Sequence, residues 1–259
     1  MTPTLQLSRD GAVARVFLDR PDVRNAFNDS VIAELTAAFA GFAADDTLRA
    51  VVLGGHGKAF CAGADLSWMR AMADYTWEQN RADAQGLADM LFAIWSCPVP
   101  VIGRVHGDCY AGGVGLAAVC DILVAAEGVN FCLSEAKLGL LPATIGPYVV
   151  KALGEQASRR YFATAERFDA ARAHALGFVH EVVPADALDA KVDELVAALV
   201  ANGPAAVRAC KKLVQDVAGR AIDDTLRAET ARRIADIRAS AEGKEGVQAF
   251  LNKRDPSWR

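Results

Sequence analysis

The fold class is decided by residues 100–126, which read PVIGRVHGDCYAGGVGLAAVCDILVAA. This stretch predicts a strand over residues 99–105, a turn at Gly107, a short helix over residues 115–120 and a strand over residues 122–125. Small residues in the turn allow backbone N–H groups to approach a ligand closely, so the turn can hold an anion or an oxyanion. Close packing of the helix against a sheet explains the same glycines equally well.

The sequence on either side of this stretch continues the alternation of strands and helices. Apolar residues recur at helical spacing from Phe27 to Phe42, with Asn28 or Ser30 as the candidate N-cap. The other elements expected in this part of the chain are strands over residues 12–18, 49–53 and 178–183 and a helix over residues 81–96. Strands that alternate with helices predict parallel β-α units.

The strand signal ends near Ala185, and the remaining sequence is helical in pattern. Helices are expected over residues 192–200, 204–217 and 222–241. We therefore predict an α/β core at residues 1–190, which carries the functional site, and a helical C-terminal extension at residues 191–259.

Composition excludes several classes of protein. The 259 residues include 28 lysines and arginines against 32 aspartates and glutamates, a net charge of -4, which argues against nucleic-acid binding. The sequence has no uncharged apolar stretch of about 18 residues and no signal-peptide pattern, so we expect a protein without a membrane span. The six cysteines and four histidines show no metal-ligand spacing, so we expect no metal site. Several cysteines have apolar neighbours, which indicates buried thiols and a cytoplasmic protein.

A dinucleotide cofactor is not expected, although residues 113–118 match G-x-G-x-x-A and Glu135 follows about twenty residues later. The predicted helix is too short for the usual crossover. The turn also lies in the middle of the chain rather than after its first strand.

A second Gly/Ala turn, KAFCAGADL at residues 58–66, also follows a strand. By itself it indicates a β-α loop with Asp65 near a helix N-terminus. Two such loops in one sheet could each supply one N–H group to the same oxygen.

A single carboxylate, Glu135, lies in the largely apolar run FCLSEAKLGLLP at residues 131–142. Burial would raise its pKa and suit it to proton transfer near neutral pH. The alternative is a surface glutamate that pairs with Lys137 or caps a helix.

Together and in this order, these segments resemble the enoyl-CoA hydratase/isomerase (crotonase) family along essentially the whole chain. The resemblance is carried by RPDVRNAF (residues 20–27), GKAFCAGADL (57–66), residues 100–126, LSEAKLGLLP (133–142) and FDAARAHALGFVHEVVP (168–184). It implies a spiral of ββα units with a helical C-terminal region that makes trimer contacts, as a homotrimer or a dimer of trimers. It also implies an acyl thioester of coenzyme A as the substrate, with no separate cofactor.

The resemblance assigns roles to particular residues. The backbone N–H groups of Ala64 and Gly112 match those that hold the thioester oxygen, and Glu135 matches a proton-handling acid. The positions that match the binding site for the nucleotide and pantetheine of coenzyme A are Arg24, Ala26, Ala62, Asp65 and Leu66.

The chain departs from the pattern of two-glutamate hydratases at Gly115, where the other acid would stand. Members with one glutamate include isomerases, decarboxylases and some hydratases, and the sequence looks most like methylglutaconyl-CoA and isohexenylglutaconyl-CoA hydratases. We therefore expect a hydratase that adds water to the 2,3 double bond of an enoyl-CoA. A double-bond isomerase and a protein that binds acyl-CoA without turnover are the alternatives.

Overall fold

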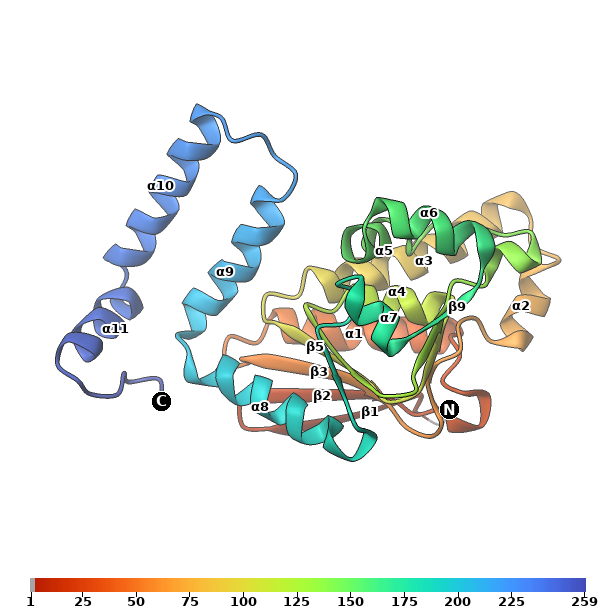
Figure 1. Ribbon diagram of the computed structural model, residues 1–259, viewed down its shortest axis with the longest axis horizontal. Coiled ribbons are helices and arrows are strands. Elements are labelled where there is room, and N and C mark those ends of the chain that lie inside the picture. The colour runs from red at the N-terminus through yellow and green to blue at the C-terminus, as the bar shows by residue number, and fades with distance from the viewer. Residues whose placement is uncertain (1–2) are drawn as a thin grey trace.

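The computed structural model describes residues 3–259 and contains two β-sheets surrounded by helices (Figure 1). The larger sheet has the strand order β1 (Leu5–Asp10), β2 (Val13–Leu18), β3 (Ala50–Gly55), β5 (Val101–Val105), β7 (Ile122–Ala126) and β10 (Glu181–Val183). β1 and β2 pair antiparallel, and all other neighbours in this sheet pair parallel. Every residue of β3 is buried, as expected for a parallel strand that is covered on both faces.

The smaller sheet consists of four strands of three residues each. Their order is β4 (Ala59–Cys61), β6 (Asp108–Tyr110), β8 (Asn130–Cys132) and β9 (Arg167–Asp169). β4, β6 and β8 pair parallel, whereas β9 pairs antiparallel with β8. Each of β4, β6 and β8 follows a strand of the larger sheet and is itself followed by a helix. The chain therefore winds through successive ββα units, and the spiral implied by the resemblance is confirmed.

The helices of the core lie on both sides of these strands. They are α1 (Asp29–Ala43), α2 (Leu66–Met72), α3 (Trp77–Trp95), α4 (Gly112–Ala118), α5 (Gly146–Leu153), α6 (Glu155–Thr164), α7 (Ala170–Ala175) and α8 (Leu188–Ala201). Short 3-10 helices stand at η1 (Pro21–Val23), η2 (Glu135–Leu138) and η3 (Ala185–Ala187). The amide of Val31 donates to the Asn28 side chain at 3.0 Å, so the predicted N-cap Asn28 is confirmed.

Several boundaries differ from the sequence-based prediction. α3 begins at Trp77 because Thr76 and Gln79 form a capping box, and α4 begins at Gly112 rather than at residue 115. β10 is confined to Glu181–Val183. α5 and α6 were not predicted from the sequence, and the residues of β4 and β6 were expected to lie in loops.

The C-terminal helices α9 (Pro204–Val217), α10 (Asp224–Ala239) and α11 (Ala241–Leu251) project from the body of the molecule (Figure 1). The predicted helix over residues 222–241 therefore ends at Ala239, and α11 is an additional helix. The expected division at residues 190 and 191 falls inside α8, which packs on the larger sheet through buried Val192 and Val196.

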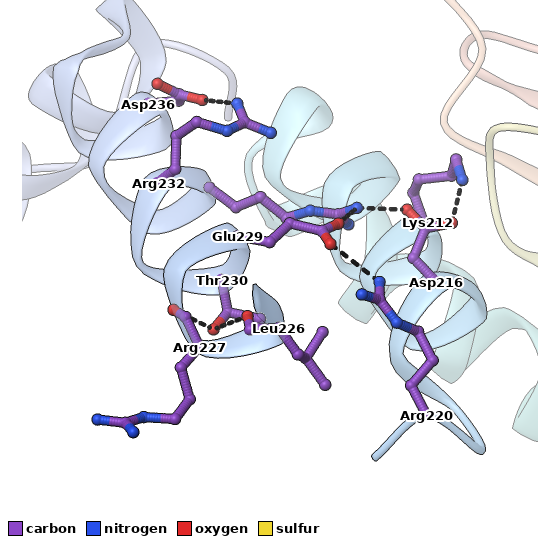
Figure 2. A network of polar contacts seen from close by, with 10 residues as sticks. Lys212, Asp216, Arg220, Leu226, Arg227, Glu229, Thr230, Arg232 and Asp236 are labelled. Atoms are coloured by element: carbon purple, nitrogen blue, oxygen red, sulfur yellow. Dashed lines mark hydrogen bonds and ion pairs between the residues drawn. The ribbon is translucent and has the colours of Figure 1, made fainter. Parts of the chain in front are cut away.

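A network of ion pairs runs through α9, the segment after it and α10, and the Asp216–Arg233 pair joins the two helices. The carboxylate of Asp216 accepts from Lys212 and Arg233, and that of Glu229 accepts from Arg220 and Arg233 (Figure 2).

Large apolar side chains of the C-terminal helices and the segments between them are exposed to solvent. They include Val214 at 66%, Ile222 at 86%, Ile234 at 48% and Phe250 at 83% exposure.

Candidate active site

The three segments singled out in the sequence follow the carboxyl ends of three neighbouring parallel strands. Ala64 follows β4, Gly112 follows β6 and Glu135 follows β8, and β6 lies between the other two strands. Carboxyl ends of parallel strands share one edge of a sheet, which is where ligands bind in many α/β proteins. The structure therefore brings two Gly/Ala loops and one carboxylate to the same edge.

The Ala64 amide points away from the chain segment that supports its loop. Phe27 forms a parallel bridge with Ala64, in which the Phe27 amide donates to the Gly63 carbonyl and the Asp65 amide donates to the Phe27 carbonyl, both at 2.7 Å. A parallel bridge uses the groups on either side of the central residue, so the N–H group of Ala64 faces the opposite side. The hydrogen bonds of residues 3–259 include none donated by the amide of Ala64 or of Gly112.

The loops after β4 and β6 are in contact. A Cβ atom built on Gly63 would lie 2.9 Å from the Ala111 Cβ and 3.6 Å from the amide nitrogen of Gly112. Gly63 also has a φ of +91°, which favours glycine. The convergence of the two loops, which the sequence could only suggest, is thus a feature of the fold.

Gly112 fits both explanations that the sequence left open, close packing of the helix and an N–H group that is available to a ligand. A Cβ atom at this position would lie 2.9 Å from the ring of Phe27, which is buried in the core, so close packing requires a small residue. The N–H group of the same residue has no acceptor among the described residues and remains available to a ligand. α4 has seven residues, so its dipole is small, and a ligand at this site would be held by single N–H groups.

Glu135 is the first residue of η2 and is partly buried. Its Oε2 atom is buried and has no hydrogen-bond partner among residues 3–259, and burial raises the pKa of its carboxyl group above the ordinary value of 4.5. The ion pairs of residues 3–259 do not include one between Glu135 and Lys137, which argues against the surface-pair alternative. A buried acceptor left without a partner is a candidate for proton transfer.

The space beside Gly115 is filled. A Cβ atom built on Gly115 would lie 2.1 Å from Ile145 Cγ2 and 2.5 Å from Ile145 Cβ. Ile145 is buried at the N-terminus of α5, where the amides of Tyr148 and Val149 donate to its carbonyl group. An aliphatic side chain therefore occupies the space into which a side chain at position 115 would extend. Sequence reasoning missed Ile145, because nothing local links it to a glycine thirty residues earlier.

The residues matched to coenzyme A binding differ in their exposure. Leu66 is 71% exposed at the start of α2, and Arg24 is exposed in the left-handed region at φ 54°. Ala62 is half-buried, and its amide donates to the Arg24 carbonyl at 3.0 Å. Ala26 is buried, and its carbonyl accepts from Arg20. Leu66 and Arg24 thus offer the most surface to a ligand.

Asp65 is occupied by contacts within the protein. Its carboxylate caps α2 by accepting from the amide and hydroxyl of Ser67, and it pairs with Arg20 at 2.8 Å. The Ser67 hydroxyl, with Arg20, lowers the pKa of Asp65 to about 2. Its side chain therefore stabilises the loop that presents Ala64. Arg20 was not predicted as a contributor, although it lies in the RPDVRNAF segment.

The described residues, 3–259, contain no group of three or more His, Cys, Asp or Glu side chains placed to hold a metal ion. In the same range, no helix is both long and apolar enough to cross a membrane.

Known proteins are similar to this chain along nearly its whole length. Residues 8–259 match the family model for enoyl-CoA hydratase/isomerase. The crystal structure of an enoyl-CoA hydratase from Shewanella pealeana has a TM-score of 0.95 and 42% identity, over 98% of this chain and 96% of that one. An enoyl-CoA hydratase of Alternaria alternata is 33% identical over 98% of this chain and 83% of its own length. A carnitinyl-CoA dehydratase of Citrobacter koseri is 32% identical over 100% of this chain and 99% of its own length. With its ββα spiral, the chain belongs to the enoyl-CoA hydratase/isomerase (crotonase) family.

Proposed function

We propose that this protein is an enoyl-CoA hydratase, which adds water across the 2,3 double bond of an acyl thioester of coenzyme A. The observation that supports this most strongly is the arrangement at the ends of adjacent strands. There the N–H groups of Ala64 and Gly112, which have no acceptor in the described part of the chain, lie with the buried Glu135 carboxyl. Family membership and the names of the relatives, two hydratases and a dehydratase, support the same reaction.

The two N–H groups are proposed to hold the thioester oxygen. Attack of water at C3 moves negative charge onto this oxygen and forms an enolate. Fixed donors stabilise the enolate more than the neutral carbonyl, and loss of one such donor costs about 3–4 kcal/mol in other enzymes.

Glu135 is proposed to handle the proton. As a carboxylate it removes a proton from water while the oxygen bonds to C3, and as an acid it then returns a proton to C2. Water is thus added with atoms and charge balanced, and one carboxyl group serves both steps. A raised pKa suits a group that must gain and lose a proton near neutral pH.

A branched glutaconyl-CoA is the proposed substrate, on the strength of the sequence resemblance. The test is to incubate the purified protein with crotonyl-CoA and with 3-methylglutaconyl-CoA and to follow the absorbance of the conjugated enoyl thioester. Loss of this absorbance supports hydration. No loss with either compound would contradict the proposal.

A double-bond isomerase is the second candidate, and Gly115 favours it. With Ile145 against it, position 115 has no room for a second acid, and an isomerase needs one base to carry a proton between two carbons. Conversion of a 3-enoyl-CoA to a 2-enoyl-CoA without hydration would select this function.

A third possibility is binding of acyl-CoA without turnover, and Glu135→Gln distinguishes it. Loss of a proton-transfer group should lower turnover by about 10²–10⁴-fold while the affinity for coenzyme A changes little. A wild-type protein that binds acyl-CoA but turns over no enoyl-CoA would be a binding protein, whereas turnover that the substitution leaves unchanged would contradict the catalytic assignment of Glu135.

We also propose that the protein is a cytoplasmic homotrimer or dimer of trimers. Phe250 and Ile234 are exposed rather than packed on the chain's own core, which supports association through the C-terminal helices. Free cysteines, four of them buried, fit a reducing compartment.

A further inference from the structure

Ala111, which immediately precedes Gly112, has a backbone conformation that disfavours a side chain. Its φ of 46° and ψ of −119° lie outside the left-handed helical region, in which Ala165 is found at φ 48° and ψ 31°. Such a conformation is strained for a non-glycine residue and persists only where surrounding contacts enforce it.

Hydrogen bonds on both sides hold Ala111 in this conformation. Its amide donates to the Cys132 carbonyl at 2.7 Å, at the end of β8, and its carbonyl accepts from the Val114 amide at 2.9 Å. The carbonyl of Ala111 and the N–H group of Gly112 belong to one trans peptide and point in opposite directions. Because the carbonyl is directed at Val114, the Gly112 N–H group is directed away from α4.

The methyl group of Ala111 contacts the neighbouring loop. A Cβ atom built on Gly63 would approach it to 2.9 Å, so the methyl group fills the space that Gly63 leaves open. Gly63 directly precedes Ala64. The methyl group therefore separates the loop that carries the Ala64 amide from the loop that carries the Gly112 amide.

We propose that Ala111 is a positioning residue for the two N–H donors, an inference that rests on the proposed function. Its ψ angle sets the direction of the Gly112 N–H group, and its methyl group fixes the spacing to the Ala64 loop. The backbone strain at Ala111 is maintained by the hydrogen bonds to Cys132 and Val114.

Replacement by glycine tests the proposal because it removes the contact and the strain together. Ala111→Gly should lower kcat by about 10- to 100-fold with little change in KM, since a misaligned donor stabilises the enolate less than an aligned one. Its Tm should not fall, because glycine adopts this conformation without strain. Ala165→Gly is the matched control at another positive φ, and its kcat should stay within about twofold of the wild-type value.

A vibrational measurement separates positioning from a structural role. Crotonyl-CoA, labelled with ¹³C at its carbonyl carbon, is bound to the slow Glu135→Gln variant, and the carbonyl stretch is recorded by difference infrared spectroscopy. Hydrogen bonds from both N–H groups should lower this frequency, and adding Ala111→Gly should remove about half of the shift or more. Ala111→Ser keeps a Cβ atom against Gly63 and should retain the shift.

The outcomes distinguish this inference from the proposed function. A full frequency shift and full kcat in Ala111→Gly would overturn the positioning role and leave the hydratase proposal standing. A Ser variant that loses the shift as completely as the Gly variant would also overturn it. No shift with Ala111 intact would overturn both.

Discussion

Gly115→Ala tests how firmly the packing of α4 against α5 excludes a side chain from position 115. The added methyl carbon would start 2.1 Å from Ile145 Cγ2, where carbon atoms normally stay about 3.5–4.0 Å apart. Ile145 would therefore have to move by more than about 1 Å. Its carbonyl is held by the amides of Tyr148 and Val149 at 3.1 and 3.0 Å, so the backbone resists this movement.

The expected cost follows from this overlap. Inserting a methyl group into a packed core costs about 1–3 kcal/mol, and an approach of 2.1 Å places this site in the upper part of that range, at about 2–3 kcal/mol. Alanine regains about 1 kcal/mol through its higher helix propensity. A net loss of about 1–2 kcal/mol corresponds to a fall in Tm of about 2–8 °C for a chain of this size.

Thermal unfolding, with Gly86→Ala as the control, measures the effect. Gly86 also lies inside a helix, but a Cβ atom there would meet nothing closer than Ile32 Cγ2 at 4.0 Å. Gly86→Ala should therefore raise the stability by about 0.5–1 kcal/mol. Equal Tm changes in the two variants would refute the packing argument for Gly115.

Four further outcomes are expected. Because burial raises the pKa of Glu135, kcat/KM should fall on the acid side with a midpoint above 4.5, and this midpoint should vanish in Glu135→Gln. An acid whose pKa is raised on folding costs stability above that pKa, so Glu135→Gln should raise the Tm at pH 7–8 relative to wild type. Lys211→Met leaves the Asp121 carboxylate without its 2.6 Å partner, and denaturant unfolding should show a loss of about 3 kcal/mol. Phe250→Ser combined with Ile234→Ser should shift the sedimentation coefficient toward a smaller species, whereas an unchanged value would argue against association through α10 and α11.

The sequence predicted those parts of the fold that have long or strongly patterned signals. The apolar runs of β3 and β5, the Asn28 cap of α1 and all of α9 follow from local pattern. The three-residue strands β4, β6 and β8 are too short to show alternation, so their parallel alignment emerged only from the structure.

The candidate site was predictable in its residues but not in its geometry. Ala64, Gly112 and Glu135 came from the sequence resemblance, whereas the contact between Gly63 and Ala111 depends on the pairing of β4 with β6. The packing of Ile145 on Gly115 likewise depends on how α4 and α5 are arranged in the fold. Asp65 shows the opposite case, because its role as a helix cap was visible locally while its pairing with Arg20 was not.

The measurement that tests the central claim most directly is the hydration rate of an enoyl-CoA by wild-type protein and by Glu135→Gln, with binding of the same compound measured in both. We predict hydration by the wild type, a loss of about 10²–10⁴-fold in kcat in the variant, and similar affinity in the two proteins. A variant that hydrates the substrate as fast as the wild type would contradict the assignment of Glu135 and, with it, the proposed mechanism.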